Sequence, residues 1–166
     1  ALAFVLLPLA RILAASPPAQ FLSDTPEQFL SWSQAWGQLG FDTAAHELHK
    51  VGEPLRIGQQ SYAKGLGHHA NGKLVVLLDG EFATFEAEVG LQPCAGGGSV
   101  VFRAWVDGQL GFDSGLMRTG DAAQPVRLPV ESAQELVLEA HDAGDGIACD
   151  MANWAEARLV ASAAVP

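Results

Sequence analysis

Two stretches of the chain hold residues whose types and spacing could do chemistry. The first, KGLGHHANG over residues 64–72, sets His68, His69 and Asn71 between glycines. The second, HDAGDGIACDMANWA over residues 141–155, holds three aspartates in a glycine-rich segment, followed by an asparagine and a tryptophan. The chemistry to be considered is metal binding, catalysis by a histidine or a carboxylate, and the binding of a polar ligand.

The histidine pair is a poor metal site. Adjacent residues of a strand point to opposite faces of a sheet, so His68 and His69 cannot easily share one ion. The sequence has no HExxH motif and no third imidazole at ligand spacing. It also has no GxSxG nucleophile elbow, and no carboxylates that sequence alone would mark as an acid–base pair. No motif in the sequence indicates catalysis, so we expect a protein that is not an enzyme.

The aspartate-rich stretch allows two interpretations. Asp142, Asp145 and Asp150 could collect oxygen ligands around a calcium ion, although their spacing is not that of an EF-hand. They could equally cap turns by accepting hydrogen bonds from backbone N–H groups. A structural calcium ion is therefore the one candidate cofactor, and the sequence requires none.

Trp154 and its neighbours have the composition of a sugar site. A flat aromatic ring can pack on the C–H face of a sugar, while carboxylate and amide groups bind the hydroxyls. Asp150 and Asn153 flank Trp154, and His69 and Asn71 of the first stretch add further polar groups. Two alternatives stay open, namely that Trp154 is a core residue leading into the last strand and that His69 has a structural role. We predict a ligand site formed by these five residues.

The elements that must position these residues are short strands, because 18 glycines and 9 prolines favour turns over long helices. In the segment 84–89, for example, Phe85, Ala87 and Val89 share one face opposite two glutamates. Similar patterns predict strands over residues 55–62, 73–79, 84–89, 99–106, 109–113, 126–130, 135–141 and 156–160. Eight to nine short strands predict an all-β fold, an antiparallel β-sandwich of jelly-roll type.

Two further features bear on the surface and the loops. In the expected strand 99–106, Trp105 lies beside Arg103 on the face that should be exposed. We expect the aromatic segment 21–42 to cover Trp105, the alternative being that Trp105 is a ligand platform. Cys94 and Cys149 lie in separate loops and fit one disulfide as well as two free thiols.

Composition limits the partners. The net charge is −10 and the pI is about 4.7, which argues against a nucleic-acid partner because phosphate binding needs a basic face. Residues 20–166 have the length and hydrophobic content of one domain. Residues 1–19 are apolar, are interrupted by Pro8 and Arg11, and end in small residues. We read them as part of a signal peptide or an apolar anchor, the alternative being an apolar helix docked on the domain or a partner. We thus expect a secreted, periplasmic or cell-surface protein.

The two stretches, together with VVFRAWVDGQLGFDSGLM over residues 100–117, resemble the NPCBM domain, which is family 51 of carbohydrate-binding modules. The resemblance runs from about Leu22 to about Leu159. It implies a non-catalytic β-sandwich that binds terminal galactose-type glycans and is usually appended to a secreted glycoside hydrolase. Such a hydrolase, or another subunit, would then be a partner outside this chain.

The family motifs transfer to this chain with two departures. The family's Gly-Leu-Gly-x-His-Ala falls on residues 65–70, so His69 is the matched histidine. Its Cys-Asp-His-Ala-Asp-Trp falls on residues 149–154, where Met151 replaces the histidine and Asn153 the aspartate. These departures leave a second function open, that of a structural or protein–protein interaction module that kept the fold and lost the sugar site. A free-standing hydrolase or lyase is the third.

Overall fold

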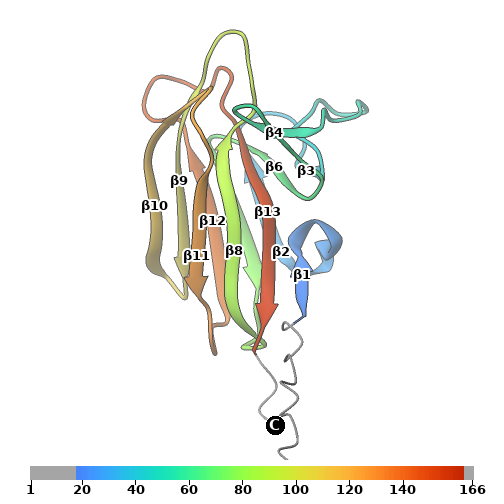
Figure 1. The fold of residues 1–166 in the computed structure, drawn as a ribbon, viewed down its shortest axis with the longest axis vertical. Coiled ribbons are helices and arrows are strands. Elements are labelled where there is room, and N and C mark those ends of the chain that lie inside the picture. Colours follow the sequence, from blue (N-terminus) through green and yellow to red (C-terminus); the bar gives the residue numbers. More distant parts are fainter. Residues whose placement is uncertain (1–17, 163–166) are drawn as a thin grey trace, which may run out of the picture.

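Two antiparallel sheets face each other in the computed structural model, which describes residues 18–162 (Figure 1). One sheet has the strand order β11-β8-β13-β6-β3, with β1 paired to the other end of β13. The second sheet has the order β10-β9-β12-β7-β2, and β4 and β5 form a separate hairpin. The predicted antiparallel β-sandwich is confirmed, with thirteen strands in the described residues rather than eight to nine.

The strands are short, as the turn-rich sequence predicts. In chain order they are β1 (Ala19–Phe21), β2 (Phe29–Gln34), β3 (Gly40–Phe41), β4 (Leu55–Ile57), β5 (Gln60–Tyr62), β6 (Gly65–His69), β7 (Gly72–Leu77), β8 (Phe82–Leu91), β9 (Ser99–Val106), β10 (Gln109–Arg118), β11 (Gln124–Pro129), β12 (Glu135–His141) and β13 (Met151–Ala161). Two single turns of 3-10 helix, η1 (Leu22–Asp24) and η2 (Pro26–Gln28), lie between β1 and β2.

The core lies between the two sheets. Phe85, Phe102 and Trp154 are its largest fully buried side chains, and the rings of Phe102 and Trp154 meet edge to face at 5.3 Å between centroids. A second, smaller cluster joins Leu55, Ile57, Tyr62 and Ala155. Because Ala155 follows Trp154 on β13, it points to the opposite face of the strand. The β4–β5 hairpin therefore covers the outer face of the sheet that contains β13.

Trp105 is not covered in the way we predicted from the sequence. The segment that was expected to cover it supplies β2, which joins the same sheet at the edge beside β7, with β12 and β7 between it and β9. The edge of β7 has unpaired backbone N–H and C=O groups, and β2 forms antiparallel hydrogen bonds with them. Trp105 stays half-buried on the outer face, where its Nε1 donates to Glu139 Oε2 at 2.8 Å.

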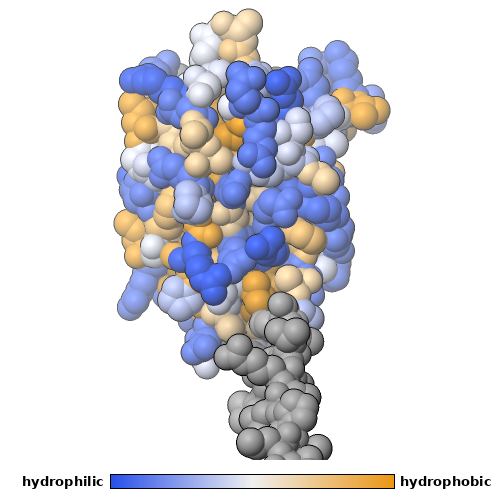
Figure 2. All heavy atoms as spheres, viewed as in Figure 1, coloured by the Kyte–Doolittle hydropathy of each residue, from blue (hydrophilic) through white to orange (hydrophobic). Residues whose placement is uncertain are grey.

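The surface mixes hydrophilic and hydrophobic residues, and Figure 2 shows hydrophobic ones along the side of the molecule where β10 lies. Leu110 and Leu116 of β10 are 48% and 49% exposed. Within residues 18–162, none of the helical turns is long and apolar enough to cross a membrane. Nearly all of the predicted signal peptide or anchor, residues 1–19, falls outside the described residues.

Candidate ligand site

Several loops meet at the end of the sandwich opposite the one where β1 begins and β13 ends (Figure 1). Residues at this end line a hollow of about 300 Å³. Its lining comes from the bend after β2, the end of β6, the β8–β9 loop and the segment leading into β13. We name it the Trp36 hollow, lined by Trp36, His69, Cys94, Ile147, Ala148, Cys149 and Met151. These residues are far apart in the sequence, so only the folded domain brings them together.

His69 and Met151 are neighbours in the hollow because their strands pair. His69 ends β6, Met151 begins β13, and the two residues are direct partners in the antiparallel register. His68 points to the other face, where it is fully buried with Nε2 3.2 Å from the carbonyl oxygen of Ser33. Burial lowers the pKa of His68 to about 4, so its ring is neutral. The prediction that the two histidines lie on opposite faces is confirmed.

The glycines of β6 allow neighbouring backbone to approach closely. A Cβ on Gly67 would lie 2.2 Å from the carbonyl oxygen of Thr43, and one on Gly65 would lie 2.5 Å from that of Trp154. Gly65 also has a φ of +138°, a conformation that side chains rarely adopt. The prediction that these glycines stand where side chains would clash is confirmed, although most of the stretch is strand rather than loop.

The ring of His69 is fixed in one tautomer. Its Nδ1 lies 2.5 Å from the carbonyl oxygen of Ala70, and because a carbonyl can only accept, Nδ1 carries the proton and donates it. Burial lowers the pKa of His69, which keeps the ring neutral. Nε2 is then the acceptor of the ring. His69 can therefore accept a hydrogen bond from a ligand in the hollow.

Trp36 supplies the exposed aromatic face of the hollow. The residue is 40% exposed, and its ring centroid lies 5.3 Å from that of His69. Gln34 Nε2 donates to the Trp36 carbonyl at 2.8 Å, and a Cβ on the following Gly37 would lie 2.7 Å from the carbonyl oxygen of His46. This indole can stack on the C–H face of a sugar. The sequence analysis did not identify Trp36 as a ligand residue. It placed Trp36 in the aromatic segment 21–42, which was expected to cover Trp105.

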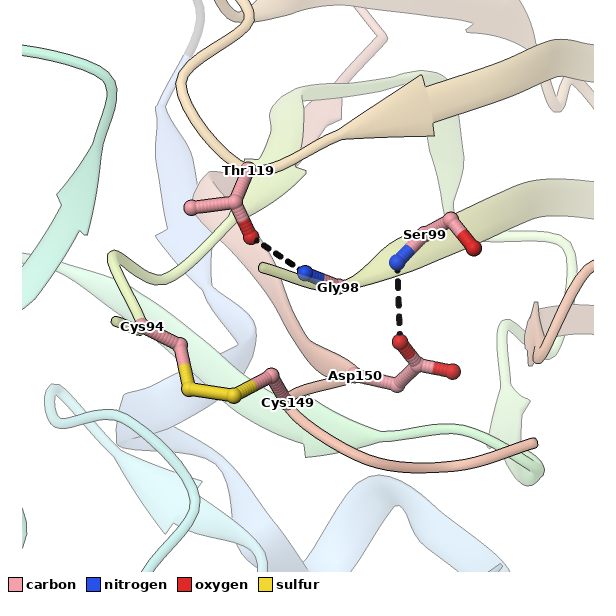
Figure 3. The surroundings of a disulfide bond; sticks show 6 residues. All are labelled: Cys94, Gly98, Ser99, Thr119, Cys149 and Asp150. Carbon is pink, nitrogen blue, oxygen red and sulfur yellow. Dashed lines mark hydrogen bonds between the residues drawn. A yellow bond between two sulfur atoms is a disulfide. The ribbon is translucent and has the colours of Figure 1, made fainter. Parts of the chain in front are cut away.

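A disulfide, drawn in Figure 3, joins two residues that line the hollow. Cys94 of the β8–β9 loop is bonded to Cys149, with 5.8 Å between their Cα atoms. The question that the sequence left open, a bridge or two free thiols, is thereby answered. A Cβ on Gly98 would lie 2.2 Å from the carbonyl oxygen of Cys149, so the loop and the segment before β13 are in direct contact.

Asp150 braces the same corner and is 1% exposed. Its Oδ1 accepts a hydrogen bond from the backbone N–H of Ser99 at 2.9 Å, as Figure 3 shows, and its Oδ2 is buried without a partner. Burial raises the pKa of Asp150 to about 6, and the charges of Asp145 and Asp142 act in the same direction. The structure gives Asp150 a structural contact with Ser99, and its sugar contact stays a prediction.

The three aspartates do not gather around one point. Asp145 Oδ2 accepts from Ser99 Oγ at 2.6 Å, near Asp150, whereas Asp142 caps a turn by accepting from the N–H of Gly144. In the part of the chain that the structure describes, no group of three or more His, Cys, Asp or Glu side chains is placed to hold a metal ion. The turn-capping interpretation thus holds for Asp142, and calcium binding stays a prediction.

The other predicted ligand residues also lie outside the hollow. Trp154 is a core residue with no exposed surface, which is the alternative that the sequence left open, and its indole has no face free for a sugar. Asn153 is equally buried and donates through Nδ2 to the carbonyl of Arg56 at 2.9 Å and to Gln92 Oε1 at 2.7 Å. It therefore holds the β4–β5 hairpin against the sheet.

Asn71 is exposed but is paired with Asp142 in two reciprocal hydrogen bonds. Its Nδ2 donates to Asp142 Oδ2 at 3.1 Å, and its Oδ1 accepts from the Asp142 N–H at 3.0 Å. Of the five predicted ligand residues, only His69 lines the Trp36 hollow.

Comparison with known families agrees with the resemblance seen in the sequence. A family model described as NPCBM/NEW2 domain matches residues 19–160. A solved structure of CBM51 from Clostridium perfringens GH95, in complex with methyl-galactose, is 28% identical, with a TM-score of 0.78 over 86% of this chain and 100% of that one. The M60 catalytic domain with CBM51-1 and CBM51-2 of Clostridium perfringens ZmpB gives 30% identity and a TM-score of 0.77 over 88% of this chain and 15% of that one. The predicted resemblance is confirmed.

A curated relative from Renibacterium salmoninarum is named as an endo-alpha-N-acetylgalactosaminidase. It is 29% identical over 155 residues, which are 90% of this chain and 10% of that protein. The chain therefore spans about a tenth of the length of this relative. NPCBM/CBM51 domains are non-catalytic binding modules, so this similarity is one to a module within a larger enzyme.

Proposed function

The chain belongs to the NPCBM/NEW2 family, and from this premise we propose that it is a carbohydrate-binding module whose ligand, a neutral galactose-type glycan, binds in the Trp36 hollow. The observation that carries the proposal is the exposed indole of Trp36 beside the neutral ring of His69. The indole stacks on the C–H face of the sugar, and His69 Nε2 accepts a hydrogen bond from it. The methyl-galactose bound by the CBM51 of 28% identity supports this class of sugar.

The module acts by targeting rather than by catalysis. One shallow polar site binds weakly, because little area is buried against the cost of ordering the ligand. Its use lies in tethering a linked domain to a glycan surface, where even a weak site raises the effective concentration. We infer that the partner is a glycoside hydrolase or another cell-surface protein, and that the module works outside the cytoplasm, where such glycans and a stable disulfide are found.

The test is binding of methyl galactoside, by calorimetry and on a glycan array, to the wild type and to Trp36→Ala. Loss of the stacking face is expected to weaken binding at least about tenfold. Trp32→Ala is the matched control, because Trp32 is 43% exposed in the same segment but does not line the hollow. The same titration with EDTA tests calcium, whose removal should weaken binding if the ion braces this end of the sandwich.

Two results would refute the proposal. One is a folded wild type, by circular dichroism, that binds no glycan on the array. The other is binding to which both tryptophan variants respond equally, because the sugar would then lie elsewhere.

A second candidate function is a protein–protein interaction module, and the outer face of the β9 sheet favours it. Leu110 and Leu116 are about half exposed there, near the half-buried Trp105 and the ion pair of Arg103 with Asp113. Aromatic residues and arginine beside apolar surface are typical of protein interfaces. If this function holds, Trp105→Ala releases a co-purifying subunit and Trp36→Ala does not.

A further inference from the structure

The outer face of the β9 sheet carries its side chains in three rows that cross the strands. Residues that pair directly on neighbouring strands point to the same face of a sheet, so the register fixes the members of each row. From β10 through β9 and β12 to β7, the first row is Leu110, Trp105, Val137 and Val75, and the second is Asp113, Arg103, Glu139 and Lys73. The third row is Leu116, Val101 and His141. A charged row thus lies between two largely apolar rows.

The apolar rows reach solvent at their β10 end. Leu110 and Leu116 are 48% and 49% exposed there, and Trp105 is half-buried beside them. The alternating charges have a role within one chain, since Arg103 Nε donates to Asp113 Oδ2 at 2.8 Å. The exposed leucines beside a tryptophan have no such role, and a contiguous apolar surface of this kind is typical of an interface.

We propose that this face binds a second copy of the chain, face to face, about a two-fold axis that runs parallel to the strands between β9 and β12. Such an axis exchanges β10 with β7 and β9 with β12, so each row lies over itself in reverse order. The charged row is negative, positive, negative, positive, and its reversal sets Asp113 over Lys73 of the second copy. It likewise sets Arg103 over Glu139.

Charge complementarity selects this axis. A row of four charges matches its own reverse only if its two halves are opposite in sign, position for position, and the charged row meets that condition. An axis across the strands would instead leave the row in the same order and set like charges over one another, which opposes association.

The same axis also matches the apolar rows. Leu110 then lies over Val75 of the second copy, and Trp105 lies over Val137. Two sheets pack in this aligned manner inside β-sandwiches, with the side chains of the facing surfaces interdigitated. The apolar side chains thus leave water together, while the charged row between them fixes the orientation.

The size of the face predicts a weak dimer. Four strands about 4.8 Å apart and three rows about 6.8 Å apart give a face of roughly 20 Å by 20 Å. Packing two such faces together buries on the order of 1,000 Å², which is at the low end for specific interfaces. We therefore expect a dissociation constant of about 10–100 µM.

The direction of the axis bears on ligand binding. An axis parallel to the strands keeps the same ends of the two copies together, so both Trp36 hollows face one way, and the ends where β1 begins and β13 ends face the other (Figure 1). Two sugar sites would then meet one glycan surface, and the second binds at a raised effective concentration. This consequence rests on the proposed function, whereas the dimer itself does not.

Sedimentation equilibrium of the 166-residue chain tests the dimer. Salt at about 0.15 M is used, because it screens the repulsion between two copies of net charge −10. Leu110→Glu should weaken association at least about tenfold, because it sets a carboxylate against an apolar side chain. Leu48→Glu is the matched control, since Leu48 is 62% exposed between β3 and β4, outside the three rows. A chain that is monomeric at about 1 mM, or association that responds equally to both variants, would overturn the inference.

Two charge variants test the orientation. Lys73→Glu sets negative charges over one another and Asp113→Lys sets positive ones, so each variant alone should associate about tenfold more weakly than the wild type. Mixed in equal amounts, the two variants should pair with each other, because the introduced glutamate then faces the introduced lysine and the native Asp113 faces the native Lys73. Both side chains are exposed, so the variants are expected to fold, which circular dichroism checks. A mixture that associates no better than its components would refute the two-fold arrangement.

The outcomes separate this inference from the proposed function. A dimer that binds no glycan would overturn the proposed function and leave the inference standing. A chain that is monomeric by itself would overturn the inference and leave the face to a different subunit. If both hold, the wild type should bind a surface coated with galactoside more tightly than it binds soluble methyl galactoside, and Leu110→Glu should lose that gain. An equal gain in Leu110→Glu would overturn the shared direction of the two hollows.

Discussion

Removal of the Cys94–Cys149 disulfide is expected to destabilise the domain and loosen the ligand site together. The two cysteines are 55 residues apart, and closing a loop of this length in the unfolded chain is worth about 4 kcal/mol in the chain-entropy model. The contact between Asp150 and Ser99 remains without the disulfide, so the sandwich stays folded while the wall of the hollow at Cys149 becomes less fixed. We therefore expect a loss of about 3–4 kcal/mol that arises chiefly in the unfolded state.

The assay is urea unfolding of Cys94→Ser/Cys149→Ser, followed by tryptophan fluorescence, beside the oxidised wild type. The reduced wild type should match the double variant, and adding reductant to the double variant is the control for effects of the reagent. Affinity for the sugar should fall several-fold, because Cys149 lies on the wall of the Trp36 hollow two residues before Met151.

A stability change below about 1 kcal/mol would refute the reasoning, because the unfolded chain would then be restricted by something other than the disulfide. Unchanged affinity in a clearly destabilised variant would refute the second half alone. In that case the hydrogen bonds to Ser99 would suffice to hold the wall of the hollow.

Two further predictions concern the buried polar residues of the same region. Asp150→Asn should flatten the dependence of the free energy of unfolding on pH between pH 4 and pH 7. The pKa of Asp150 rises from 3.8 to about 6 on folding. The contribution of Asp150 to stability is therefore fully present below pH 3.8 and is lost as the pH rises through 6. The neutral amide of asparagine has no such loss. Urea unfolding at pH 4 and pH 7 measures this, and equal pH slopes for the two proteins would contradict it. Asn153→Ala should cost about 1–3 kcal/mol, because the carbonyl of Arg56 loses its donor, with sugar affinity unchanged; weaker binding in calorimetry would place Asn153 at the ligand.

Alternation in the sequence predicts the strands that have one face on the core. β8, β9 and β12 are of this kind, and each was expected within a few residues of its observed bounds. β6 was not predicted, because all five of its residues are buried and show no alternation. The core lies on one face of β6, and the chain around Thr43 packs on the other. The expected strand 55–62 is instead the β4–β5 hairpin, since the chain turns at Gly58 with a φ of +56°. The alternation of polar and apolar residues along the chain does not reveal burial by segments that are distant in the sequence.

The candidate site was harder to predict than the fold. His69 was found through a motif, but Trp36 owes its place to the turn at Gly37 and the pairing of Gln38 with His46, which are contacts between segments without periodicity. Trp154 was misplaced for the opposite reason. Polar neighbours in the sequence suggested an exposed ring, yet Asp150 and Asn153 are themselves buried and bonded to backbone. A polar residue beside an aromatic one marks a ligand site only if both reach the surface.

The two departures from the family motif lie in different surroundings, because one position is covered by the β4–β5 hairpin and the other is not. Met151 and Asn153 are two residues apart on β13, so they point to the same outer face of the sheet. The β4–β5 hairpin lies over Asn153 and accepts its hydrogen bond, whereas Met151, at the start of the strand, opens onto the Trp36 hollow. We therefore expect a change at position 153 to act on stability, and a change at position 151 to alter the wall of the hollow. The loss of two polar family residues is then no argument that binding is lost, because only one of the two positions lines the hollow.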